Sequence, residues 1–138
     1  GLKKDINLLS DDLNNIKIKN LKLNVSAPFH CKYMKTASEK MTKYINDLKM
    51  NNLEKPIISN VTASETSSSK EIKLLLISQI EKKVRWLESV EYMINNGIKN
   101  FVEIGPGKVL SGLIKRINKN VIVNSINSEE DIKLLTND

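Results

Sequence analysis

The chain has 138 residues, of which 40% are apolar, and this is enough for the core of one modest domain without any apolar run near the ~20 residues that cross a bilayer. The chain has one cysteine, so it cannot form an intramolecular disulfide framework, and we expect a soluble protein of a reducing compartment. That cysteine and the one histidine beside it are too few ligands for a zinc site, so we expect no metal. The net charge of +6 comes from 20 lysines and two arginines against 16 acidic residues, and only 4% of residues are aromatic, which argues against nucleic acid and favours an acidic protein partner.

A helix and a strand are predicted first. Ile6, Leu9 and Leu13 recur at helical spacing. The stretch IKIKNLKLNVSAP (16–28) then alternates apolar and polar residues, as a half-buried strand does, and Pro28 ends it because proline lacks the amide proton that a central strand needs. In residues 32–50 the apolar positions form one face of a helix of about five turns.

The rest of the chain alternates short strands with helices. IISNVTA (57–63) predicts a buried strand, and SETSSSKE (64–71) predicts a polar loop in which Ser68 caps the next helix, with Glu71 at capping-box spacing. The remaining predicted elements are a helix through Leu75, Leu76 and Ile80, a helix from Trp86 to Ile94 that ends at NNG, a strand at FVEIG (101–105), a helix at PGKVLSGLIKRI (106–117), a strand at VIVNSIN (121–127) and a polar tail.

This order of elements predicts an α/β domain with a largely parallel sheet. The helix and strand before Pro28 have no obvious partner, so the chain is interpreted as the later part of something longer. The stretch EIGPGKV (103–109) places two glycines around a proline where backbone amides can face a phosphate. It fits neither a Walker nor a dinucleotide motif, and a tight structural turn is favoured.

The only histidine, His30, follows the predicted strand in VSAPFHC (25–31), and loops at strand ends are where α/β folds gather reactive groups. A catalytic histidine needs a nucleophile and a partner for its other ring nitrogen. The chain has no Gly-x-Ser-x-Gly elbow, and Ser111 lies inside a predicted helix. Cys31 adjoins His30 on a segment expected to be extended, so their side chains should point apart and Cys31 should be a small buried filler. His30 is therefore either structural or half of an active site.

Four blocks in this order and spacing, VSAPFHCKYM, IISNVTA, VRWLESVEYM and VEIGPGKVLSGLIKRI, closely resemble the C-terminal part of malonyl-CoA:acyl carrier protein transacylases. The resemblance runs from about Leu21 to Asn127. It implies that residues 1–25 end a small ferredoxin-like subdomain. Residues 26–138 would then form the C-terminal part of the large subdomain of an α/β-hydrolase-like acyltransferase fold.

Members of this family move a malonyl group from coenzyme A to a serine and then to the phosphopantetheine thiol of acyl carrier protein, without a cofactor or metal. The resemblance implies that His30 is the general base and acid, and that Gln79 occupies the position whose hydrogen bond orients that histidine. It also implies that Phe29 lies where relatives distinguish malonyl from methylmalonyl. Asn60 and the turn at 105–107 match family blocks that are mainly architectural.

The family's serine, its malonyl-binding arginine and its oxyanion-hole glutamine belong to blocks upstream of Gly1, and neither Arg85 nor Arg116 matches that arginine. The chain alone is therefore expected to be inactive. The expected partners are malonyl-CoA, acyl carrier protein and the missing N-terminal part of the same enzyme, but no nucleic acid and no membrane. The setting would be fatty-acid biosynthesis in the cytoplasm or in an organelle of bacterial descent.

Two alternatives remain open. The chain could be a piece of an acyltransferase domain from a polyketide or multifunctional synthase, which would perform the same chemistry. It could also be a non-catalytic basic binding module that merely retains the scaffold.

Overall fold

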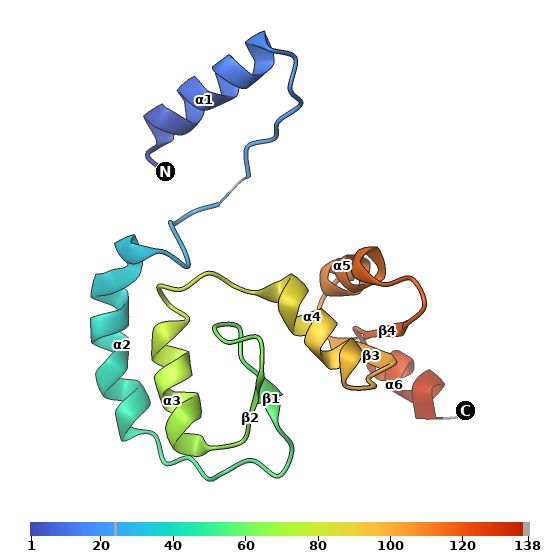
Figure 1. Cartoon of the computed structure of the whole chain (residues 1–138). Coiled ribbons are helices and arrows are strands. Elements are labelled where there is room, and N and C mark those ends of the chain that lie inside the picture. The colour runs from blue at the N-terminus through green and yellow to red at the C-terminus, as the bar shows by residue number, and fades with distance from the viewer. Residues whose placement is uncertain (24, 137–138) are drawn as a thin grey trace.

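The computed structural model describes residues 1–23 and 25–136 as a mixed α/β chain (Figure 1). Its elements in order are α1 (Lys3–Asn15), a 3₁₀ turn η1 (Lys32–Met34), α2 (Lys35–Asp47), β1 (Ile57–Ile58), β2 (Glu65–Thr66), α3 (Ser69–Ser78), α4 (Trp86–Asn95), β3 (Asn100–Ile104), α5 (Val109–Ile117), β4 (Ile122–Ile126) and α6 (Glu129–Thr136).

The predicted first helix is confirmed as α1, but the strand predicted over residues 16–28 is wrong. Asn24 lies outside the described residues, and the rest of this segment forms no strand. A strand is held by hydrogen bonds to a neighbouring strand, and no strand of the described residues pairs with this segment. Its apolar side chains are exposed, with Leu21 at 85% and Leu23 at 77%. Figure 1 shows α1 and residues 16–23 standing apart from the other elements.

The helix predicted over residues 32–50 is formed by η1 and α2, although it ends at Asp47. α2 packs beside α3 (Figure 1), and α3 begins at the predicted cap, where Ser68 Oγ accepts a hydrogen bond from the Glu71 amide at 3.4 Å. β1 confirms only the start of the strand predicted over 57–63, because the chain turns back at Ser59 and pairs antiparallel with β2. β2 lies inside the stretch predicted as a loop.

The C-terminal elements form a second layer around a parallel strand pair. β3 and β4 run parallel from Asn100 opposite Ile122 to Ile104 opposite Ile126. The two strands share a buried apolar core with α4 and α5. Its buried residues are Val90 of α4, Phe101 of β3, Ile114 of α5 and Val121 just before β4. The predicted elements α4, β3, α5 and β4 are thus confirmed, but of the two sheets that the described residues form, only one is parallel.

The turn between β3 and α5 is the tight structural turn that was favoured. Gly105 and Gly107 have φ values of 135° and 93°, which residues with a side chain rarely adopt. The amides of Leu110 and Ser111 at the start of α5 donate to the Glu103 carboxylate at 3.1 and 2.8 Å. These amides therefore bind a carboxylate of the chain itself, at the turn where a phosphate was the alternative considered from the sequence.

Candidate functional site

His30 lies on an exposed turn just before η1, after the segment 16–28 that was predicted as a strand. Its φ of 58° is in the left-handed region, which few residues other than glycine occupy. The turn is closed by the Phe29 amide, which donates to the Ala27 carbonyl at 2.9 Å, and by Cys31 Sγ, which donates to the Pro28 carbonyl at 3.1 Å. The expectation of an extended segment is therefore wrong at His30. Cys31 is partly exposed, so it is not the buried filler that was predicted.

One ring nitrogen of His30 has a defined partner. Nδ1 lies 2.7 Å from the backbone carbonyl oxygen of Gln79. Gln79 is the C-cap of α3, where the last carbonyls of a helix lack partners within the helix. Because a carbonyl only accepts, Nδ1 carries the hydrogen, and Nε2 of the neutral ring is left as the basic nitrogen. An acceptor that holds Nδ1 in this way is one of the features that a histidine general base requires.

The side chain of Gln79 faces the hairpin loop between β1 and β2. Asn60 Nδ2 in that loop donates to Gln79 Oε1 at 3.4 Å, and the Asn60 carbonyl accepts from the Arg85 amide at 3.0 Å. The Arg85 guanidinium bonds in two directions, with Nη1 donating to the Thr62 carbonyl at 3.0 Å and Nε donating to Glu88 Oε1 at 3.1 Å. The described structure therefore connects His30 to the start of α4 through Gln79 and Asn60.

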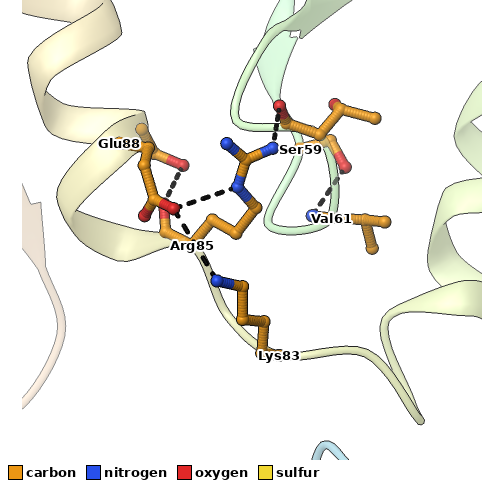
Figure 2. Close-up of polar contacts among 7 residues, drawn as sticks. Ser59, Val61, Lys83, Arg85 and Glu88 are labelled. Atoms are coloured by element: carbon orange, nitrogen blue, oxygen red, sulfur yellow. Dashed lines mark hydrogen bonds and ion pairs between the residues drawn. The ribbon is translucent and has the colours of Figure 1, made fainter.

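Figure 2 shows the charged end of this network, where Arg85 and Lys83 both approach the carboxylate of Glu88. The amide of Glu88 itself and the Arg85 side chain lower the pKa of Glu88 by hydrogen bonding, so this carboxylate is ionised at neutral pH. The sequence did not single out Arg85 and Glu88 as functional. The only available signal was their place in the block VRWLESVEYM.

Phe29, beside His30 in the chain, and Ser111 were also weighed from the sequence. The Phe29 side chain is 57% exposed. Ser111 in α5 is bonded through Oγ to Glu103 at 2.6 Å and to Ser125 at 2.8 Å. A cavity of about 470 Å³ is lined by Lys108, Ser111 and Asp131 among others, and neither His30 nor Gln79 lines it.

The described residues therefore bring His30 into contact with Gln79, but they place no hydroxyl or thiol in a hydrogen bond with the imidazole. Within residues 1–23 and 25–136, no serine, threonine or cysteine side chain is bonded to His30. In the same part of the chain, no three His, Cys, Asp or Glu side chains gather as a metal would require. None of its helices is long and apolar enough to cross a membrane.

Comparison with known proteins gives consistent relatives, although no family model matches. The chain is 41% identical over 111 residues to the malonyl CoA-acyl carrier protein transacylase of Staphylococcus aureus (strain MSSA476), covering 80% of this chain and 36% of that protein. It is 40% identical over 112 residues to the protein of the same name from Bacillus subtilis (strain 168), covering 81% of this chain and 35% of that protein. The chain thus spans about a third of the curated relatives that it matches.

Solved structures agree with these relatives. The malonyl CoA-acyl carrier protein transacylase of Clostridium perfringens matches with a TM-score of 0.84 and 35% identity, covering 96% of this chain and 42% of that chain. A malonyl-transacylase in complex with its type II PKS acyl-carrier protein matches with a TM-score of 0.85 and 31% identity, covering 99% of this chain and 45% of that chain. The mixed α/β arrangement described above is therefore similar to part of these structures.

Proposed function

Because this chain is homologous to the malonyl CoA-acyl carrier protein transacylases and spans about a third of their length, we propose that it is the C-terminal part of such an enzyme and carries the general base. The observation that supports this role is the 2.7 Å contact between His30 Nδ1 and the Gln79 carbonyl, which leaves Nε2 free. The whole enzyme would transfer malonyl from coenzyme A to acyl carrier protein in fatty-acid biosynthesis.

His30 would act in two successive acyl transfers, with a serine supplied by the part of the enzyme outside this chain. In the first, Nε2 takes the serine proton as the serine oxygen bonds to the thioester carbon, and it returns that proton to the departing coenzyme A sulfur. In the second, Nε2 takes the proton of the carrier thiol as sulfur attacks the malonyl ester, and the proton returns to the serine oxygen. The Gln79 carbonyl stabilises the protonated ring throughout by accepting from Nδ1.

The division of the chain is part of the same proposal. Residues 1–25 would end a small ferredoxin-like subdomain, and residues 26–138 would belong to a large α/β-hydrolase-like subdomain. Two exposed apolar surfaces support this division. One is formed by Leu21 and Leu23, which precede the described turn at His30 and are strongly exposed. The other is the strand pair itself, in which Val102 is 49% and Ile104 79% exposed, whereas parallel sheets are normally covered on both faces.

The exposed ring of Phe29, next to His30 in the chain, would contact the malonyl group. The net charge of +6 would favour an acidic carrier protein, in line with the carrier complex among the similar structures. Docking through charge should weaken as the Debye length falls to about 3 Å at 1 M salt. A KM for the carrier that stays flat from low salt to molar salt would contradict this part of the proposal.

The proposal is tested with the completed enzyme, which is this chain joined to the part of a curated relative that it does not span. After incubation with malonyl-CoA, intact-mass analysis should show one malonyl adduct on the completed enzyme and none on this chain alone. Holo acyl carrier protein should then remove the adduct. An adduct on the chain alone would reveal a nucleophile within it, and a completed enzyme that is never acylated would contradict the proposed function.

A carrier comparison tests the pathway. The similar structure with a type II PKS carrier keeps the polyketide alternative in view. We expect the completed enzyme to show the higher kcat/KM with a fatty-acid carrier. A higher value with a polyketide carrier would support the alternative, and the same chemistry would then serve polyketide synthesis.

A further inference from the structure

We propose that Arg85 and Asn60 are positioning residues that hold the Gln79 carbonyl in place for His30. The inference rests on the proposed role of His30 as the base. It assigns a function to Arg85, which belongs with Lys83 and Glu88 to a charged cluster at the start of α4. The proposed acyl transfer does not involve this cluster.

The first part of this arrangement is the Arg85 fork, which joins α4 to the hairpin loop 59–64 (Figure 2). Nε bonds the Glu88 carboxylate and Nη1 bonds the Thr62 carbonyl, at 3.1 and 3.0 Å. The planar guanidinium reaches these two acceptors at once, which a lysine ammonium on a flexible stem does less well. The side chain is only 36% exposed, so water competes only partly for these bonds.

Hydrogen bonds within the hairpin loop tie its residues together. The Ser59 amide donates to the Ser64 carbonyl at 3.0 Å, and the Ala63 amide donates to the Ser59 carbonyl at 2.8 Å. Ser59 is itself buried, and its Oγ accepts from the Val61 amide at 3.1 Å (Figure 2). Asn60 lies between these bonds, so its position follows that of the loop.

Asn60 then fixes both ends of segment 79–85, which connects α3 to α4. Its Nδ2 donates to the side-chain oxygen Oε1 of Gln79 at 3.4 Å, and its carbonyl accepts from the Arg85 amide at 3.0 Å. Gln79, whose carbonyl contacts His30, therefore lies at one end of segment 79–85, and Asn60 is bonded to both ends of that segment. The 3.4 Å bond is the longest contact in the series, so it is where we expect the arrangement to yield first. A small displacement matters because a misplacement of about 1 Å in a catalytic array can cost roughly 10²-fold in rate.

The direct test measures the tautomer of His30, which gives one set of imidazole signals because it is the only histidine in the chain. In the neutral ring, ¹⁵N shifts give the ratio of the Nδ1–H to the Nε2–H form. Arg85→Met should lower this ratio about fivefold, the factor that a net hydrogen bond of about 1 kcal/mol represents. Lys83→Met is the matched control, because Lys83 approaches the same carboxylate at 4.0 Å but bonds no residue of the loop.

A second variant keeps the test valid if Arg85→Met does not fold, as judged from the signals of the fully buried Val90. Asn60→Ala removes the amide contact with Gln79 and leaves the Arg85 side chain in place, and it should lower the ratio in the same direction. In the proposal both residues position the same carbonyl. The double variant should therefore lower the tautomer ratio by less than the product of the two single-variant factors. An unchanged ratio in the folded variants, or an equal fall in Lys83→Met, would overturn the proposal.

The completed enzyme provides the kinetic test. Arg85→Met should lower kcat about tenfold or more, leave the KM for malonyl-CoA unchanged and add nothing in a His30→Ala background. An unchanged kcat would overturn the positioning role while leaving the proposed function intact. If the parent enzyme transfers no malonyl, the proposed function fails, and the tautomer ratio in this chain still decides whether Arg85 and Asn60 position His30.

Discussion

The left-handed backbone at His30 predicts an unusual order of stability among substitutions at this position. With φ at 58°, an L residue carries a steric cost of roughly 1–2 kcal/mol that glycine avoids. His30→Gly and His30→Ala both remove the imidazole and its bond to the Gln79 carbonyl. A comparison of these two variants therefore leaves only the effects of the backbone at this position.

The expected difference follows from two opposing effects. Relief of the strain favours the glycine variant by roughly 1–2 kcal/mol, and the greater freedom of glycine in the unfolded chain disfavours it by roughly 0.4–1 kcal/mol. The lost hydrogen bond is common to both variants and cancels. We therefore expect the free energy of unfolding of His30→Gly to exceed that of His30→Ala by about 0.5–1 kcal/mol.

Urea unfolding followed by circular dichroism measures this difference. With a slope of about 1–3 kcal/mol per M urea, the midpoint of His30→Gly should lie several tenths of a molar above that of His30→Ala. His30→Asn should fall between them, because asparagine tolerates the left-handed region better than alanine. An alanine variant as stable as the glycine variant would refute a left-handed backbone at this position.

Three further predictions concern specificity, pH and helix capping. Phe29→Ser in the completed enzyme should raise the kcat/KM ratio of methylmalonyl-CoA to malonyl-CoA by about tenfold or more, because one methyl group is worth roughly 10–200-fold in such a pocket; an unchanged ratio would place specificity elsewhere. The hydroxyl and amide of Ser111 lower the pKa of Glu103 below its ordinary 4.5, so the stability from this contact is present above pH 4.5 and is lost as the pH falls through the lowered pKa. The Ser111 amide signal should report that loss, and Glu103→Gln should abolish the pH step; a step that persists would assign it to another group. Ser68→Ala should lower the free energy of unfolding by about 1 kcal/mol in urea titrations, and no change would show that Ser68 does not cap α3.

Much of the fold could be predicted because the elements have local signals. The periodicity around Ile6 and Leu9 and the stop at NNG each depend on neighbouring residues, and the corresponding helices formed. β2 and the failed strand over 16–28 depend on pairing with distant residues, which no local pattern shows. α6, where the sequence predicted only a polar tail, has a local signal as well: Ser128 and Asp131 stand at capping-box spacing and bond each other's amides.

The pairing of His30 with Gln79 could be predicted from the sequence, but the geometry of their contact could not. The family resemblance, which the 41% identity to a curated relative confirms, placed His30 and Gln79 together. The contact is made by the Gln79 main chain, so the residue type at that position could not reveal it. The link from Arg85 to Asn60 joins segments that meet only in the folded chain, and for this reason the sequence showed Arg85 only as one of two arginines.

The role of His30 is tested most directly by the turnover of the completed enzyme with His30→Ala, measured with malonyl-CoA and acyl carrier protein. A positioned acid–base group contributes about 10²–10⁴-fold, so kcat should fall by this factor while the affinity for coenzyme A changes little. A variant with near-normal turnover would make His30 a structural residue and contradict the proposal that this chain carries the base of the enzyme.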